Sequence, residues 1–173
     1  MMSFLLYFKL MILGQPLCLL GQTFEQVDST LTERVRTGSD SLQIILITRP
    51  TMTYNKDLTI IAKSKDGWYG ESYMFDKRNE KKEATKIFNL TNKYTLQPKK
   101  NWETFIEELY KLNVLNLTSK ELLMLDGTEY TFQIITQNSR REYKYNAYGK
   151  KPMDDAEKII RAIQGELKQK RVK

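Results

Sequence analysis

The sequence contains no histidine, and its only cysteine is Cys18, close to the amino terminus. These absences exclude Ser-His and Cys-His nucleophile pairs and any zinc site that uses histidine. If the segment around Cys18 is removed from the mature protein, a disulfide within the mature chain is excluded as well. Any chemistry therefore has to rest on carboxylates, hydroxyls, amines and aromatic side chains.

The 8 glycines are scattered along the chain, and the sequence has no GxSxG, P-loop or GxGxxG pattern. The two pairs of adjacent acids, at 107–108 and 154–155, fall in predicted helices, where neighbours diverge by about 100° and cannot converge on one bond. We therefore predict no catalytic residue, no cofactor and no metal site.

The first 21 residues lack the unbroken apolar run of about 20 residues that a membrane-spanning helix needs, because Lys9 and Pro16 interrupt them. An interrupted apolar amino terminus is typical of a signal peptide. We predict cleavage between Gly21 and Gln22. The alternatives are a lipid anchor at Cys18 and a buried amino-terminal helix.

A cleaved signal peptide predicts an exported protein, periplasmic or secreted, that contacts a membrane only through the uncleaved signal. The remainder, residues 22–173, has the length of a single domain. With 40% hydrophobic and 28% charged residues, the chain has the composition of a folded protein.

The chain is basic, with a net charge of +7 and a sequence pI near 9.3. Loss of Lys9 with the signal peptide lowers this charge by one. Such a charge is compatible with an anionic envelope component or an acidic protein as the partner. Nucleic acid is not expected as a partner, because an exported protein rarely meets it.

Three amphipathic helices are predicted from end signals and apolar spacing. The first begins at a possible capping box of Thr23 and Gln26 and runs to about residue 36. The second follows the cap residue Asn101. The third starts at Pro152 and has a buried stripe that reaches Leu167. Basic residues follow at its carboxyl end: Lys168, Lys170, Arg171 and Lys173.

Strands are predicted where short apolar or alternating runs lie between turn residues. The predicted strands are 42–48, 57–64, 68–75, 84–91, 130–134 and 141–147. The first three form an antiparallel meander, because a two-residue Asp-Gly turn joins the second to the third. The fold class is α+β: an antiparallel sheet of five to six strands in two hairpin or meander units, with the three helices packed on it.

Core and turn positions follow one another in a recognisable order in the last 75 or so residues: Trp102, Phe105, Asp126, Gly127, Tyr130, Phe132, Tyr143 and Tyr145. In this order the segment resembles small exported bacterial proteins of unknown function. It implies an exported α+β protein and brings no activity or site residue.

Arg140, Arg141 and Lys144 are the candidate partner-binding residues, because they form a basic strip on or beside one predicted hairpin. The alternative is an edge strand that its charges keep from aggregating. A second candidate surface is aromatic, with core packing as its alternative; its residues are Trp68, Tyr69, Tyr73, Tyr143, Tyr145 and Tyr148.

The missing histidine and mature cysteine favour a non-catalytic binding or inhibitory module of the cell envelope or of the secreted proteins. The alternative is a hydrolase that uses carboxylate or Ser-Lys chemistry. A clustered pair of buried carboxylates in a deep pocket would favour the hydrolase.

Overall fold

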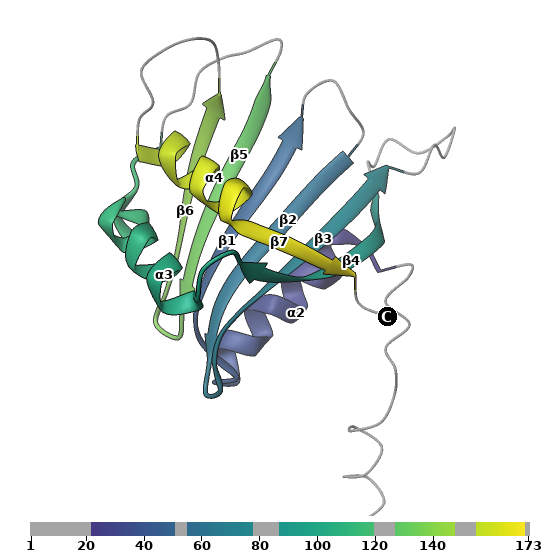
Figure 1. Ribbon diagram of the computed structural model, residues 1–173. Helices are drawn as coiled ribbons and strands as arrows, with labels where there is room; N and C mark the ends of the chain where they lie inside the picture. The colour runs from purple at the N-terminus through teal and green to yellow at the C-terminus, as the bar shows by residue number, and fades with distance from the viewer. Residues whose placement is uncertain (1–21, 51–54, 78–86, 120–126, 148–154, 172–173) are drawn as a thin grey trace, which may run out of the picture.

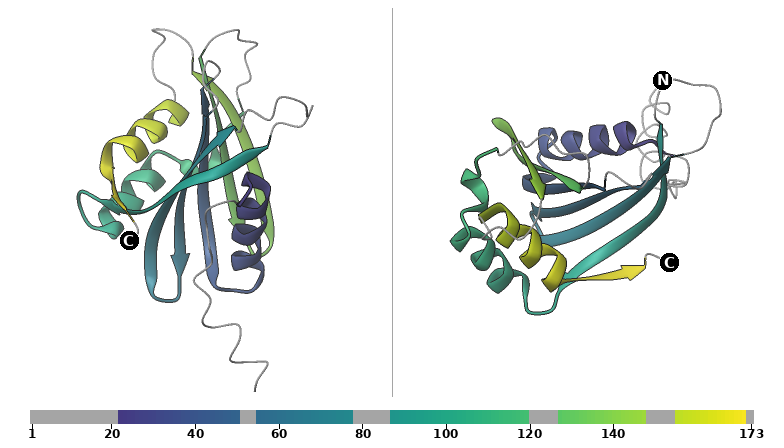
Figure 2. Two further views of the ribbon diagram at one scale, coloured as in Figure 1. Left: turned by 90° about the vertical axis from the view of Figure 1, so that its right-hand side faces the viewer. Right: turned by 90° about the horizontal axis from the view of Figure 1, so that it is seen from above.

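The structure is a computed structural model, and it describes residues 22–50, 55–77, 87–119, 127–147 and 155–171. The described chain is α+β, as predicted, and consists of an antiparallel sheet with helices on both faces (Figure 1, Figure 2). The predicted signal peptide lies outside the described residues, and so does Gly21 at the predicted cleavage site. The described chain starts at Gln22, whose carbonyl accepts a hydrogen bond from the Leu90 N–H (2.8 Å).

Helix α2 (Phe24–Arg36) begins at the predicted capping box. The Thr23 hydroxyl accepts a hydrogen bond from the Gln26 N–H (3.3 Å), and the Gln26 side chain accepts one from the Thr23 N–H (2.8 Å). Two of the free N–H groups at the helix start are thereby satisfied. The buried face of α2 consists of Phe24, Val27, Leu31 and Val35.

The first four strands form an antiparallel meander: β1 (Asp40–Pro50), β2 (Asn55–Ser64), β3 (Gly67–Lys77) and β4 (Phe88–Pro98). The predicted meander of three strands is confirmed. The strand predicted at 84–91 differs, because β4 continues to Pro98 and residues 84–86 lie outside the described part. The sequence pattern missed the second half of β4 because much of it is polar and only partly covered.

Strands β5 (Thr128–Thr136) and β6 (Ser139–Ala147) form the second hairpin. Strand β5 pairs antiparallel with β1, so the hairpin extends the meander on the side away from β4. The strand order across the sheet is β6-β5-β1-β2-β3-β4-β7. Strand β1 lies third in this order and is therefore an interior strand of the sheet.

Helices α3 (Trp102–Lys111) and α4 (Asp155–Glu166) cover the face opposite α2, with the short 3₁₀ helix η1 (Val114–Asn116) beside them (Figure 2). Asn101 caps α3 as predicted, since its side-chain oxygen accepts a hydrogen bond from the Thr104 N–H (2.8 Å). The predicted first residue of the last helix, Pro152, lies outside the described residues.

The prediction of five to six strands is wrong, because the described residues form seven. The chain leaves α4 after Glu166 and continues as strand β7 (Leu167–Arg171), which pairs with β4; we had predicted that this basic segment ends the helix. The Lys99 N–H donates to the Glu166 carbonyl (2.9 Å) at the change of direction. The free edge of β4 supplies backbone partners that a five-residue basic segment does not reveal by its own pattern.

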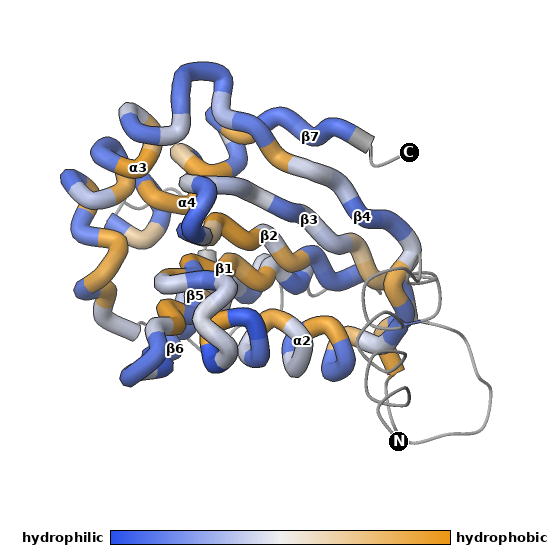
Figure 3. Tube along the Cα trace, turned by 90° about the horizontal axis from the view of Figure 1, so that it is seen from below, coloured by the Kyte–Doolittle hydropathy of each residue, from blue (hydrophilic) through white to orange (hydrophobic). Residues whose placement is uncertain are grey.

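Each face of the sheet has its own hydrophobic core. Ile45 and Ile47 of β1 pack in the core beneath α2, whereas Ile44 and Leu46 pack in the core beneath α3 and α4. Figure 3 shows the same pattern, with hydrophobic residues concentrated in the central strands and a hydrophilic β7 at the edge. Strand β1 is thus buried on both sides, which explains its unbroken apolar run.

The structure predicts that Gly70 of β3 cannot be replaced without cost. A Cβ atom at Gly70 would lie 2.9 Å from the Leu96 Cβ and 2.9 Å from the Trp102 Cη2, where α3 approaches the sheet. Gly70→Ala should lower the free energy of unfolding by roughly 1–3 kcal/mol through overpacking. Urea unfolding measures this difference.

The matched control is Gly165→Ala in α4, where the added Cβ meets no atom within 4 Å. This change should raise stability by about 0.5–1 kcal/mol, since alanine favours the helix over glycine. Equal stability of Gly70→Ala and the wild type would contradict the close packing of α3 on β3.

Candidate functional site

Polar side chains collect on one stretch of the sheet face that carries α3 and α4. In the antiparallel register, Thr48 of β1 lies opposite Asp57 of β2, and Thr59 of β2 lies opposite Ser72 of β3. Leu46 lies opposite Thr59 and belongs to the core beneath α3 and α4, so Thr59 is on the face of the sheet that these helices cover. Because side chains alternate along a strand, all of these residues point to the same side.

The end of α4 and strand β7 pass in front of these strands (Figure 1). Between them lies a cavity of about 200 Å³, which we call the α4–β7 cavity. Its lining residues are Leu46, Thr48, Asp57, Thr59, Ser72, Leu96, Ile163, Gln164, Leu167 and Gln169. The cavity thus combines aliphatic side chains with hydroxyls, amides and one carboxylate.

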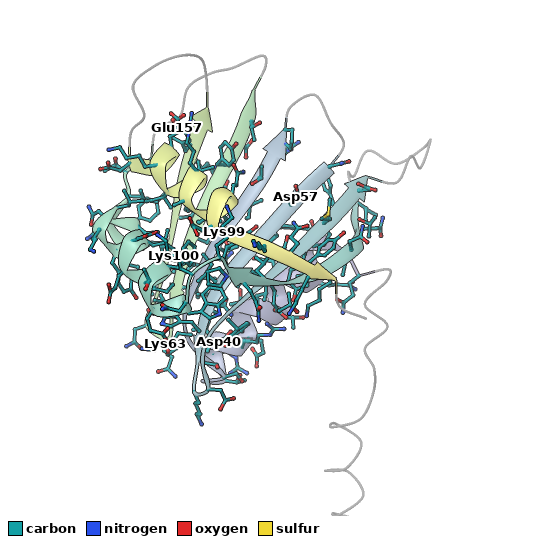
Figure 4. All side chains as sticks on the ribbon, viewed as in Figure 1. Asp40, Asp57, Lys63, Lys99, Lys100 and Glu157 are labelled. Carbon is teal, nitrogen blue, oxygen red and sulfur yellow. The ribbon has the colours of Figure 1, made fainter. Side chains whose placement is uncertain are left out.

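Asp57 is the acidic group among the described lining residues of this cavity. Its Oδ1 is buried and has no hydrogen-bond partner among the described residues. Burial raises the pKa of Asp57, and the nearby charge of Asp76 raises it further. These effects leave the charged form of Asp57 poorly stabilised by the residues around it. In Figure 4, Asp57 and Asp40 lie at opposite ends of the sheet.

A second polar cluster, centred on Glu71 of β3, lies on the other face of the sheet, beneath α2. Arg34 of α2 donates to the Glu71 Oε2 (2.6 Å), and Lys93 of β4 lies 2.6 Å from the Glu71 Oε1. The Tyr73 hydroxyl donates to the Glu71 Oε2 (2.9 Å). Each oxygen of this carboxylate therefore has a cationic partner.

The pKa values in this cluster follow from its contacts. Burial would raise the pKa of Glu71, but Arg34 and Lys93 outweigh burial and hold it below its ordinary value. Burial also opposes the charge of Arg34, yet Glu71 raises the pKa of Arg34. Glu71 and Arg34 thus keep their charges at neutral pH, and the cluster ties α2 to β3 and β4 as a structural element.

A buried hydrogen-bond chain continues from this cluster to the start of β1. The Arg34 guanidinium lies 3.4 Å from the Tyr69 hydroxyl, which donates to the Asp40 Oδ2 (2.7 Å). The Gln43 side-chain amide donates to the same oxygen (2.7 Å) and to the Leu31 carbonyl (3.0 Å). Asp40 is thereby satisfied by protein groups, in contrast to Asp57.

The predicted partner-binding residues lie on β6, an edge strand, but not on one face of it. Arg140 and Lys144 fall on the α2 side of the sheet, whereas Arg141 lies opposite Ile134 and faces the other side. The Arg140 Nη2 is 3.3 Å from the Asp28 Oδ2 of α2, so this cation has a structural partner. Partner binding at these three residues stays a prediction.

The candidate aromatic surface does not assemble on one side of the sheet. Trp68, Tyr143 and Tyr145 pack with the core beneath α3 and α4, whereas Tyr69 and Tyr73 belong to the α2 side. Tyr148 lies outside the described residues. Core packing therefore accounts for the described members of this set.

Comparison with known protein families, with curated proteins and with solved structures finds no match for this chain. Within the described ranges, no group of three or more Asp, Glu, His or Cys side chains is placed to hold a metal ion. No helix in those ranges has both the length and the apolar content to cross a membrane.

Sequence reasoning did not single out the residues of the α4–β7 cavity. Residues 57–64 were predicted as a buried strand, and the polar Asp57 and Thr59 that alternate with Leu58 and Ile60 were not interpreted further. That alternation is the available sequence signal for a polar patch on one face of an interior strand. No such sequence signal marks the residues of β7 that line the cavity.

The structure predicts that Glu71→Gln destabilises the fold in a pH-dependent way. The pKa of Glu71 is below its ordinary value of 4.5 in the folded protein, so its stabilising effect is complete above that value and is lost as the pH falls through the lowered pKa. At pH 7 the variant should lose about 2 kcal/mol of unfolding free energy, because it leaves two partly buried cations without their anion.

This difference should shrink when urea unfolding is repeated at a pH well below 4.5. The control is Glu33→Gln, which removes an exposed ion pair with Arg36 within α2 and should leave stability almost unchanged. A pH-independent effect of Glu71→Gln would show that the side-chain shape and not its charge matters there.

Proposed function

We propose that this chain is an exported, non-catalytic binding module that holds a small ligand in the α4–β7 cavity. The observation that carries the proposal is the lining of this cavity, in which four aliphatic side chains lie beside six polar ones. Ligand sites in proteins combine apolar contact with polar groups that fix the orientation of the ligand.

The composition and size of the cavity support binding of a small molecule. Leu46, Leu96, Ile163 and Leu167 supply apolar contact, while the hydroxyls of Thr48, Thr59 and Ser72 and the amides of Gln164 and Gln169 supply hydrogen-bonding groups. A volume of about 200 Å³ is smaller than the roughly 300–1,000 Å³ of sites for drug-sized ligands. The ligand is therefore a small molecule.

The alternative, a hydrolase with carboxylate or Ser-Lys chemistry, has weaker support. Asp57 is the acid among the described lining residues, whereas carboxylate hydrolysis of glycosides uses two acids that flank one bond. Ser72 and Lys93 do not form a Ser-Lys pair at this cavity. Ser72 lines the cavity, whereas Lys93 of the neighbouring strand β4 faces the other side of the sheet, where it binds Glu71. These placements favour binding over catalysis as the proposal.

Blocking the cavity entrance should abolish ligand binding without affecting the fold. Gln169 is an exposed lining residue on the edge strand β7, so Gln169→Trp adds bulk at the rim and leaves the core intact. Ligand-observed NMR with a library of small polar molecules should give hits for the wild type that Gln169→Trp loses.

Lys170→Trp is the matched control, because Lys170 is the next residue along β7, is also exposed, and faces the other side of the sheet. This variant should retain the hits. The proposal fails if no library member binds the wild type, or if Gln169→Trp and Lys170→Trp bind alike.

Export is proposed from the amino-terminal sequence. The two residues that follow the predicted cleavage site take part in the fold, since the Gln22 carbonyl accepts a hydrogen bond from the Leu90 N–H and Thr23 caps α2. Amino-terminal sequencing of the mature protein from its native host should find Gln22 as the first residue. An intact Met1 on a cytosolic protein would refute export and leave the cavity proposal untouched.

A further inference from the structure

We propose that the ligand of the α4–β7 cavity carries a protonated amine, which the carboxylate of Asp57 receives. This inference rests on the proposed function and names the chemistry of the ligand for the same site.

Asp57 lines the cavity, while its Oδ1 is buried and accepts no hydrogen bond from any described residue. Buried polar atoms in folded proteins are nearly always hydrogen-bonded, and an unsatisfied buried acceptor is costly. Because the Oδ1 itself is out of reach of the cavity, a ligand approaches this carboxylate from another side. A cationic group there offsets the cost of burying the negative charge.

Asp57 is the one charged side chain among the described lining residues of the cavity. Asp76 lies diagonally from it on the same face, since Asp76 pairs with Asn55 two residues along β2. A lining acid without a lining cation among the described residues favours a cationic group in the cavity over an anionic one.

Calcium takes six to eight oxygen ligands, whereas an ammonium group has three donors to satisfy and so needs fewer oxygen partners. Thr48 lies directly opposite Asp57, and Thr59 lies two residues along the same strand on the same face. One carboxylate and two neighbouring hydroxyls therefore match the needs of a primary ammonium group.

Besides Asp57, the described lining residues are four aliphatic side chains, Leu46, Leu96, Ile163 and Leu167, and five polar ones. The aliphatic side chains favour a short apolar body on the ligand. The cavity volume of about 200 Å³ has room for several water-sized groups. A primary amine on an apolar chain of about five carbons fits these limits.

The test uses three probes of equal length with the full chain at pH 7: n-pentylammonium, 1-pentanol and pentanoate. Chemical-shift titrations of the ¹⁵N-labelled protein should show pentylammonium bound in the α4–β7 cavity. Pentanol should bind at least tenfold more weakly, and pentanoate should not bind. The difference between ammonium and alcohol isolates the charge, because the apolar chains are identical.

Variants then assign the effect to Asp57. Asp57→Asn keeps the shape of the side chain, removes the charge, and should weaken pentylammonium binding at least tenfold while the spectrum remains that of a folded protein. Asp76→Asn should weaken it less. Asp66→Asn, in the exposed turn between β2 and β3, is the charge-matched control and should bind as the wild type does.

Two results overturn the inference. If pentanol binds as well as pentylammonium, and Gln169→Trp abolishes both, the cavity is a ligand site but does not select an amine, so the proposed function stands without the inference. If pentylammonium binds equally to Asp57→Asn and the wild type, or does not bind the wild type, Asp57 is not an ammonium receptor.

Discussion

The burial of strand β1 on both faces is the constraint on which the rest of this structure depends. Its four consecutive residues Ile44–Ile47 alternate between the two cores, so two sets of helices must cover the sheet, one on each side. A helix layer on one side alone would leave half of these side chains in water, at a cost of about 1.5–3 kcal/mol for each. Helix α2 covers one side, and α3 and α4 cover the other.

The same constraint fixes the register of the strands beside β1. A slip by one residue would exchange the residues of the two faces, bringing Asp57 and Thr59 beneath α2 and apolar residues into the α4–β7 cavity. The long antiparallel pairings of β1 with β2 and with β5 prevent this. The cavity and the Glu71 cluster on the opposite face are thus both consequences of one register.

Helix caps and apolar runs in the sequence predicted the helices and strands whose form depends on nearby residues. The Thr23 and Gln26 capping box, the Asn101 cap and the apolar run of β1 each predicted their element, because caps and periodicity act over a few residues. Strand β7 could not be predicted in this way, since its strand form depends on the free edge of β4, about 70 residues earlier in the chain. The cavity depends on the same long-range pairing, which is why the sequence did not reveal it.

Glu71 and Asp57 show how differently the two faces of one sheet treat a carboxylate. Glu71 has a cation on each oxygen, and Asp40 on the same side is held by Tyr69 and Gln43, whereas the Asp57 Oδ1 has no described partner. The protein is not short of cations, since Lys and Arg outnumber Asp and Glu by 28 to 21. A structural role for Asp57 would be expected to recruit one of them, as Glu71 does with Arg34 and Lys93. Because Asp57 lies in the wall of a cavity and has no cationic partner among the described residues, its charge is available to a ligand in that cavity.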